Sequence, residues 1–224
     1  MTHPAIDTTD PRSRMVDCQL RPNKVSDSRI LGAMRTLPRE RFLPPALAAL
    51  AYADADVPLA GGRCLMAPMA LARLVQLADP QPGERVLTVG AGTGYGAAVL
   101  AACGASVVAL EEAEDLLHIA RAVAGEFAPG VQLVAGPLAA GWRAGAPYDL
   151  VFIEGGFAQL PVAIAEQVRA NGGRLVGVRV MAGRIGQAVL GERAGITPAI
   201  SLRPAFDCAT PALPGLRREP GFVF

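Results

Sequence analysis

The chain has 224 residues, 51% of them hydrophobic, and its 21 Lys and Arg nearly balance 20 Asp and Glu. This length suits one α/β domain with an appendage. The near-neutral charge argues against a module that binds nucleic acid through its phosphates, which needs a basic surplus. Because glycines and charges interrupt every long apolar stretch, we expect no membrane span.

Residues 1–14 lack the basic start and the apolar stretch of a secretory signal, and we expect them to form a disordered lead. The four cysteines are widely spaced, with no C-x-x-C pair, and the chain has only two histidines. We therefore expect no metal site, and the cysteine pattern is typical of a reduced protein of the cytoplasm.

Residues 15–80 are expected to form a helical cap. Three stretches there favour helices, at 27–37, at 38–52 after a turn, and at 67–78. Asp54–Met66 lies between the second and the third, has no clear periodicity and is expected to be a loop. We expect the cap helices to pack over the carboxyl ends of the strands, where α/β folds bind ligands.

Residues 81–224 alternate between strand and helix patterns. Five stretches rich in Val, Leu and Ile indicate buried parallel strands, at Arg85–Val89, Ser106–Glu111, Val131–Ala135, Asp149–Glu154 and Arg174–Arg179. Helical stretches lie between them, at Gly96–Cys103, Ala113–Phe127 and Leu160–Ala170. Two further strands, at 184–193 and 196–206, are expected to be antiparallel and to close one edge. The sequence thus predicts an α/β fold with a mostly parallel sheet.

The stretch VLTVGAGTGYGAA, residues 86–98, places glycines at every second position, at Gly90, Gly92 and Gly94. Such a turn lets the backbone approach a ligand closely. Three interpretations compete: a tight turn without a ligand, a dinucleotide site, and a site for S-adenosylmethionine. A dinucleotide site needs G-x-G-x-x-G, and here Tyr95 stands where the third glycine belongs.

An acid for a ribose follows at the expected distance. Glu111 ends the next strand, 21 residues after Gly90, and a carboxylate there can accept hydrogen bonds from both ribose hydroxyls. Sites for NAD and for S-adenosylmethionine share this spacing. The acid therefore indicates a nucleoside without choosing between the two.

The order of these elements resembles the class I S-adenosylmethionine-dependent methyltransferases, and more narrowly the protein-L-isoaspartate O-methyltransferase family. Besides the glycine turn, the segments that carry the likeness are 15–45, 52–77, 131–156 and 160–179. The ordered set is more specific than the turn alone, and it covers about Met15 to Arg179.

The resemblance implies a Rossmann-like, doubly wound sheet with an N-terminal helical cap and antiparallel C-terminal edge strands. It also implies methyl transfer from S-adenosylmethionine to the stray α-carboxylate of isoaspartyl residues in proteins or peptides, a repair reaction. We expect a monomer or weak dimer that needs neither nucleic acid nor membrane. Because a carboxylate is already ionised at neutral pH, the reaction needs no general base, and we assign no catalytic residue.

The resemblance also implies the residues of the site. The cofactor would contact residues of the turn and of the neighbouring strand ends, namely Thr88, Gly90, Ala91, Gly92, Gly94, Glu111, Pro137, Leu138 and Glu154. The acceptor would lie against one loop, formed by Arg63, Cys64, Leu65, Met66, Ala67 and Pro68. Glu154 is expected at a strand end, either facing the cofactor or in water.

The sequence departs from the family pattern at ligand positions. Met66 and Cys64 stand where the family loop carries hydroxyl residues, and neither replaces a hydroxyl donor well. Thr88 stands in place of an acid, and Pro137 follows Gly136 where an acid would accept from the adenine. Arg63 partly offsets these losses, because a guanidinium attracts a carboxylate; a solvated loop arginine is the alternative.

Three other functions stay open at this point. A degenerate member could bind S-adenosylmethionine or a peptide as a scaffold, without turnover. A methyltransferase for a less polar acceptor is the second alternative. A nicotinamide enzyme is the third, and the position of Tyr95 argues against it.

Overall fold

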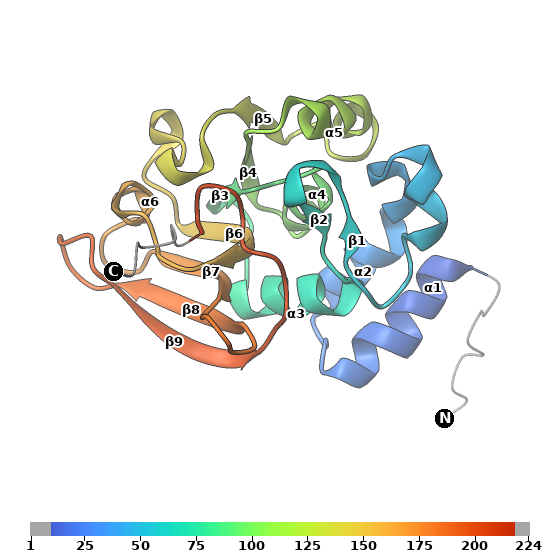
Figure 1. The fold of residues 1–224 in the computed structure, drawn as a ribbon, viewed down its shortest axis with the longest axis horizontal. Coiled ribbons are helices and arrows are strands. Elements are labelled where there is room, and N and C mark those ends of the chain that lie inside the picture. Colours follow the sequence, from blue (N-terminus) through green and yellow to red (C-terminus); the bar gives the residue numbers. More distant parts are fainter. Residues whose placement is uncertain (1–9, 218–224) are drawn as a thin grey trace, which may run out of the picture.

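The computed structural model describes residues 10–217, within which seven strands form one sheet in the order β5-β4-β3-β6-β7-β8-β9 (Figure 1). Strands β3 to β7 pair in parallel, and β8 and β9 pair antiparallel. The strands are β3 Arg85–Val89, β4 Ser106–Glu111, β5 Gln132–Ala135, β6 Leu150–Phe157, β7 Arg174–Arg179, β8 Gln187–Arg193 and β9 Ile200–Asp207. The expected α/β fold, with its parallel sheet and antiparallel edge, is confirmed.

The order in which strands are added to the sheet changes side at β3. The chain steps outward through β4 to β5, then returns to place β6 on the other side of β3. The carboxyl ends of β3, β4 and β6 therefore meet at the switch point of the sheet, the usual ligand position in an open α/β fold, and we call this position the crevice. The glycine turn follows β3 directly, so the fold brings the turn to this crevice.

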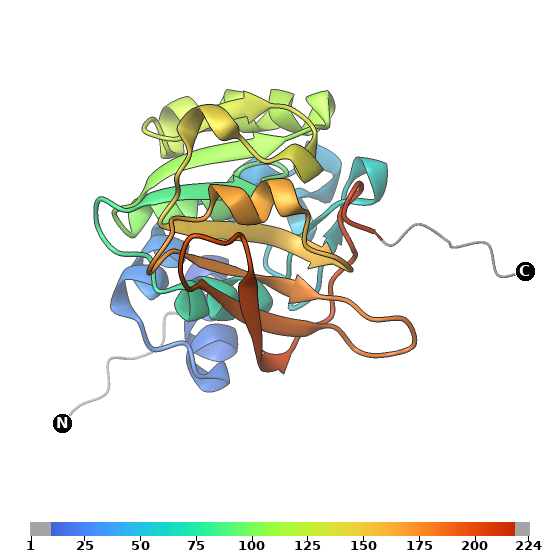
Figure 2. The same ribbon diagram turned by 90° about the vertical axis from the view of Figure 1, so that its left-hand side faces the viewer.

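Helices cover both faces of the sheet, and the buried apolar residues form one core on each face. The larger core holds α2 (Ser28–Thr36), α3 (Pro68–Ala78), α4 (Tyr95–Ala102) and α5 (Glu114–Phe127). The smaller core holds α6 (Val162–Gln167) and the segment after β9. Figure 2 looks onto the second side, with α6 and the dark red segment in front of the sheet and the cap helices behind it.

Two elements have bounds that differ from the sequence-based expectation. Strand β6 continues to Phe157, so Glu154 is not a strand end; a register shift between Phe152 and Gly156 lets the strand go on pairing with β7. Helix α6 ends at Gln167, before the expected Ala170. The reason is that Val168 is extended and forms a bridge with Tyr148.

The N-terminal region differs more. Helix α1 (Pro11–Met15) begins within residues 1–14, the expected disordered lead, because Asp10 caps it by accepting from the amides of Arg12 and Ser13. A π-helix (Val16–Leu20) and a 3-10 turn (Arg21–Asn23) continue it. Residues 1–9 lie outside the described part of the chain. The segment 38–52 forms two 3-10 helices, Arg39–Phe42 and Pro45–Leu50, rather than an α-helix.

We expected the cap helices to cover the carboxyl ends of the strands, but in the structure they do not. Helix α3 packs against the face of β6, β7 and β8, and α2 packs against α4. The segment that reaches the strand ends is Asp54–Met66, which contains a small antiparallel pair, β1 (Val57–Pro58) with β2 (Cys64–Leu65). A loop, and not a helix, therefore covers the crevice.

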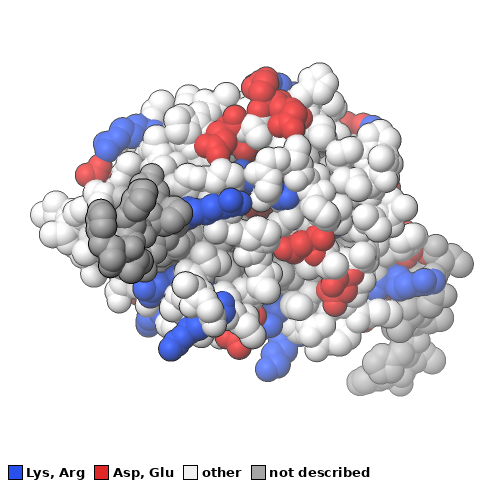
Figure 3. All heavy atoms as spheres, viewed as in Figure 1, with Lys and Arg blue, Asp and Glu red and all other residues white. Residues whose placement is uncertain are grey.

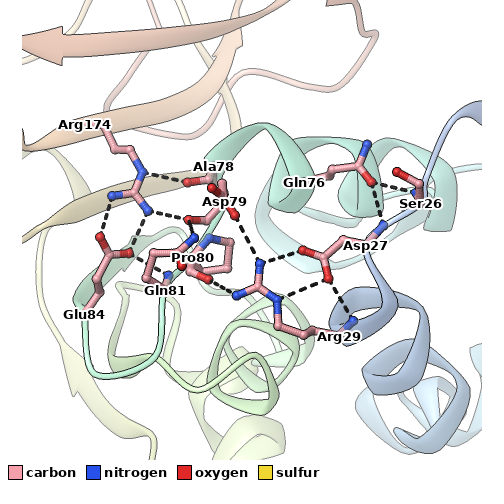
Figure 4. Close-up of polar contacts among 10 residues, drawn as sticks. All are labelled: Ser26, Asp27, Arg29, Gln76, Ala78, Asp79, Pro80, Gln81, Glu84 and Arg174. Atoms are coloured by element: carbon pink, nitrogen blue, oxygen red, sulfur yellow. Dashed lines mark hydrogen bonds and ion pairs between the residues drawn. The ribbon is translucent and has the colours of Figure 1, made fainter.

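A polar network holds the cap helices at the opposite end of the sheet, where the parallel strands begin (Figure 4). Arg174 donates to the carboxylate of Glu84 at 2.7 Å and to the carbonyls of Ala78 and Asp79 at the end of α3. Arg29 on α2 bonds to Asp27 and Asp79. The network thus ties both cap helices to the start of β3 and β7. None of the helices within residues 10–217 is long and apolar enough to cross a bilayer.

The Arg174→Met variant is expected to lose about 1.5–3 kcal/mol of free energy of unfolding, because Glu84 and two carbonyls lose a charged donor. Urea denaturation followed by circular dichroism measures the loss. The matched control is Arg203→Met, since Arg203 pairs with Glu192 in solvent, with side chains 64% and 58% exposed. The control should cost less than about 1 kcal/mol. Equal losses of unfolding free energy in the two variants would mean that the network stabilises the fold no more than an exposed ion pair does.

Candidate functional site

The glycine turn after β3 has the geometry its sequence predicts. Gly90, Gly92 and Gly94 all have positive φ, at 78°, 57° and 90°, a region that side chains disfavour. The amides of Gly90 and Ala91 both donate to the carbonyl of Leu110 at 3.0 Å, which fixes the turn against β4. Helix α4 then starts at Tyr95. The turn therefore presents its backbone at the crevice.

Glu111 lies at the end of β4, with its side chain fully buried against the turn. Its Oε2 accepts from the amide of Gly92 at 2.7 Å, and its Oε1 accepts from the amides of Glu112 and Ala113 at 2.9 and 3.1 Å. The carboxylate predicted to hold a ribose is thus at the glycine turn. The structure brings together the two parts that sequence spacing had paired.

Arg63 is buried, so the solvated-arginine alternative is wrong. Its guanidinium donates to Glu111 Oε1 at 3.0 Å and forms an ion pair with Oε2 at 2.9 Å. It also donates to the carbonyl of Gly90 at 2.7 Å. Side-chain exposure is 2% for Arg63 and 0% for Glu111. The loop is therefore joined to the crevice by a buried, two-pronged ion pair, the strongest geometry for such a pair.

Asp56 shapes the rest of the loop. Its Oδ1 accepts from the amide of Ala67 at 2.7 Å, and its Oδ2 accepts from the Cys64 thiol at 3.5 Å. Burial, together with the charge of Asp56, raises the pKa of the Cys64 thiol to about 12. The thiol therefore stays protonated and does not act as a nucleophile at neutral pH.

Met66 and its neighbours Leu65 and Pro68 pack into the larger core, as a Met in an irregular gap often does. The carbonyl of Met66 accepts from Arg39, a fully buried arginine that sequence reasoning did not find. Arg39 also donates to the carbonyl of Ala51 at 2.7 Å and lies over the ring of Tyr95 at 4.9 Å. No pattern in the sequence marks Arg39, because its neighbours 38–45 read as an ordinary charged turn.

Glu154 lies within β6 beside the start of α4, and it is 6% exposed. Its Oε2 has no hydrogen-bond partner among residues 10–217. A Cβ on Gly96 would come within 2.3 Å of this oxygen, so the glycine leaves the room that Glu154 occupies. Burial raises the pKa of Glu154 to about 8, against the opposing effect of Arg63 and Arg39. The carboxyl group is therefore mostly protonated at pH 7 and can donate a hydrogen bond.

The segment 208–217, which we call the strap, crosses the crevice from the other side. It pairs with the end of β6. The amide of Gly156 donates to the carbonyl of Pro211 at 2.9 Å, and the amide of Leu213 donates to the carbonyl of Gly156 at 2.8 Å. Leu213 is 4% exposed and lies against Gly90 and Gly155. The dark red segment passes in front of β6 and β7 in Figure 1.

The remaining predicted residues surround the crevice less closely. Thr88 is fully buried, and its Oγ1 has no partner within residues 10–217. Pro137 is exposed, while Leu138 is buried and its amide donates to the carboxylate of Glu112 at 3.3 Å. Glu112 therefore places an acid beside the Gly136–Leu138 turn. Tyr148 packs and donates to the carbonyl of Trp142 at 2.8 Å, in keeping with a structural role for both.

Charges of both signs lie scattered among neutral side chains on the face shown in Figure 3, which is viewed as in Figure 1. Lys and Arg do not gather into one patch there. A hollow of about 390 Å³ opens between the loop and the strap, lined by Asp56, Pro58, Leu59, Gly62, Arg63, Cys64, Pro211 and Arg217. The loop thus offers space on its outer side, next to the buried ion pair.

The chain is similar to known proteins along most of its length. The family model "Protein-L-isoaspartate(D-aspartate) O-methyltransferase (PCMT)" matches residues 12–189. A protein-L-isoaspartate O-methyltransferase of Methylorubrum extorquens is 39% identical over 175 residues, which are 78% of this chain and 76% of that protein.

Two solved structures share the fold. One, a protein-L-isoaspartate O-methyltransferase, has a TM-score of 0.75 and 26% identity, and the match covers 90% of this chain and 65% of that one. The other, from Plasmodium falciparum and described as a complex with S-adenosyl-L-homocysteine, has a TM-score of 0.75 and 18% identity; the match covers 91% and 98% of the two chains. The class I methyltransferase fold, Rossmann-like and doubly wound, is confirmed.

Buried Glu154 is expected to make stability depend on pH. Its pKa is about 8 in the folded chain against an ordinary value of 4.5, so the folded state holds a proton that the unfolded state loses. The free energy of unfolding therefore falls as pH rises through this interval. The Glu154→Gln variant carries no such proton, so its advantage in Tm over wild type should be larger near pH 8.5 than near pH 6.

Thermal unfolding at the two pH values checks this expectation. Glu166→Gln is the matched control, because Glu166 is 40% exposed and pairs with exposed Arg143. Its difference from wild type should stay nearly constant. A Glu154→Gln difference that is equally constant would contradict the shifted pKa.

Proposed function

This chain belongs to the protein-L-isoaspartate(D-aspartate) O-methyltransferase family, and we propose that it methylates the α-carboxylate of isoaspartyl residues in proteins or peptides, with S-adenosylmethionine as donor. The observation that carries the proposal is the buried Glu111 carboxylate, which lies 2.7 Å from the amide of Gly92 at the crevice. A carboxylate beside a glycine turn is the arrangement that a ribose requires.

The residues at the crevice fit the nucleoside part of this cofactor. Gly90, Ala91, Gly92 and Gly94 would lie against it with their backbone, and Glu111 would accept from its ribose hydroxyls. Thr88, Pro137, Leu138 and Glu154 are the further residues that we assign to the cofactor site. Arg63 and Leu213 now cover Gly90, so both side chains have to move before the cofactor is held.

The chemistry demands little of the protein beyond positioning. S-adenosylmethionine, when bound, supplies an electrophilic methyl group on a sulfonium sulfur, which is a good leaving group. The acceptor carboxylate is ionised at neutral pH, so no residue has to remove a proton. The loop Arg63–Pro68 has to hold the acceptor in line and keep water away, which can account for much of the rate enhancement. A His or Cys dyad is therefore not required.

The family loop's hydroxyl groups are replaced here by groups of another kind. Cys64 stays a neutral thiol, and Met66 lies in the core, so neither side chain presents a strong donor. We assign the donor role to Arg63 and to loop amides. A charge-assisted hydrogen bond is about twice as strong as a neutral one, so one guanidinium can compensate for more than one lost hydroxyl.

We place this repair activity in the cytoplasm, in a monomer or weak dimer that works without nucleic acid. All four cysteines are free thiols, in keeping with a reducing compartment. The near-neutral charge of the sequence gives no electrostatic reason for nucleic-acid binding. The names of the curated relatives, which are those of methyltransferases, favour a transferase over a scaffold that only binds.

The Glu111→Gln variant is expected to bind S-adenosylhomocysteine about 10- to 100-fold more weakly than wild type, because an amide replaces a charged acceptor. Isothermal titration calorimetry measures the binding. Glu114→Gln is the matched control, since Glu114 is 71% exposed on α5 and should leave the affinity unchanged. Methylation of an isoaspartyl peptide should fall in parallel with binding.

Two results would overturn the proposed function. One is the absence of any wild-type binding at millimolar S-adenosylhomocysteine. The other is tight cofactor binding with turnover on other carboxylates but none on an isoaspartyl peptide. Thermal unfolding of both variants confirms that they are folded before the affinities are compared.

A further inference from the structure

Two side chains of the protein occupy the surface that the proposed cofactor needs. A Cβ added to Gly90 would lie 2.7 Å from Leu213 Cδ1 and 2.9 Å from Arg63 Nη2. A Cβ added to Gly155 would lie 2.6 Å from Leu213 Cδ2. Leu213 is thus wedged between the glycine turn and β6, and the guanidinium covers the carbonyl of Gly90. The crevice is closed by the loop from one side and by the strap from the other.

Glu111 has no free bonding direction to offer a ribose while Arg63 remains. Three backbone amides and the guanidinium already share its two oxygens, and the side chain is fully buried. A carboxylate oxygen has about two acceptor sites. The three amides belong to the turn and to the start of α5, so they leave about one acceptor site, on Oε2. A ribose hydroxyl can therefore bond to Glu111 only in place of Arg63.

A guanidinium expelled from this ion pair needs another anion. An unpaired charge left in a buried place costs several kcal/mol, and the Nε of Arg63 already lacks a partner within residues 10–217. Arg63 directly precedes the strand β2 (Cys64–Leu65), and it lines the hollow between the loop and the strap. The residue therefore borders both the crevice, where its guanidinium lies, and that hollow.

We propose that Arg63 exchanges partners: it pairs with Glu111 in the free protein, and the bound cofactor releases it to bind the carboxylate of the methyl acceptor. This inference rests on the proposed function, from which it takes the cofactor and the acceptor's charge. The exchange conserves ion pairing, because a new carboxylate replaces the one that is lost. It makes binding ordered, with the cofactor first.

The strap takes part in the same exchange. The side chain of Leu213 covers the turn through apolar contact, while the amide of Leu213 and the carbonyl of Pro211 both bond to Gly156 of β6. Shortening Leu213 opens the turn without touching Arg63. The Leu213→Ala variant should therefore bind S-adenosylhomocysteine more tightly than wild type, by about four- to fifteenfold if the wedge contributes one or two methyl contacts.

Calorimetry on the wild-type protein tests the order directly. An isoaspartyl peptide should bind at least about tenfold more tightly when S-adenosylhomocysteine is saturating than when it is absent, the factor expected for one charged hydrogen bond. Equal affinity in both states would overturn the exchange. This measurement needs no variant, so a misfolded mutant cannot decide it.

Two substitutions separate Arg63 from the cofactor. The Arg63→Met variant should keep or improve its affinity for S-adenosylhomocysteine, since Glu111 is no longer occupied, and should lose the cofactor-dependent gain in peptide affinity. Arg63→Lys should restore part of that gain, because a charge returns without the fork. Arg203→Met, on exposed β9, should match wild type in both titrations.

The outcomes distinguish the exchange from the proposed function. If Arg63→Met weakens S-adenosylhomocysteine and peptide equally, Arg63 serves the cofactor or the fold, and the exchange is wrong while the methyltransferase stands. If the wild-type protein does not bind S-adenosylhomocysteine at millimolar concentration, the proposed function itself fails.

Discussion

The buried carboxylate of Glu111 is the group on which the arrangement at the strand ends depends. A carboxylate taken out of water has to be paired and fully hydrogen-bonded. Here the bonds come from the turn after β3, from the start of α5 and from the loop in front of the sheet. One side chain therefore fixes three separate segments, and a change in its partners affects all three together.

The fold was accessible from the sequence because its signals are local. The strands Arg85–Val89 and Ser106–Glu111 are rich in Val and Leu without alternation, which is typical of strands buried on both faces. The partner of Glu111 was not accessible. Arg63 lies in a loop without periodicity, and its contact with Glu111 spans 48 residues. Leu213 likewise belongs to a proline-containing tail that gives no sign of where it returns.

The surroundings of Glu154 also depend on contacts that the local sequence does not show. The glycines that follow it carry no strand signal, so the sequence suggests a strand end. The backbone nevertheless continues to pair with β7 after a register shift, and the strap bonds to Gly156 from the other side. Both partners of this stretch, Val178 and the strap, are more than twenty residues away along the chain. The carboxyl group is thereby enclosed rather than solvated, and its chemistry changes from that of an anion to that of a neutral acid.

Helix α3 runs along one face of the sheet from the end where the loop lies to the end where the strands begin. It begins at Pro68, where the loop leaves the crevice, and it ends at Ala78, where Arg174 holds the carbonyls of its last turn. The buried face of α3 lies against β6, β7 and β8. The loop residues Leu65 and Met66, just before this helix, are buried in the same core. The helix held by Arg174 where the strands begin is therefore the same helix from which the loop of Arg63 is positioned where the strands end.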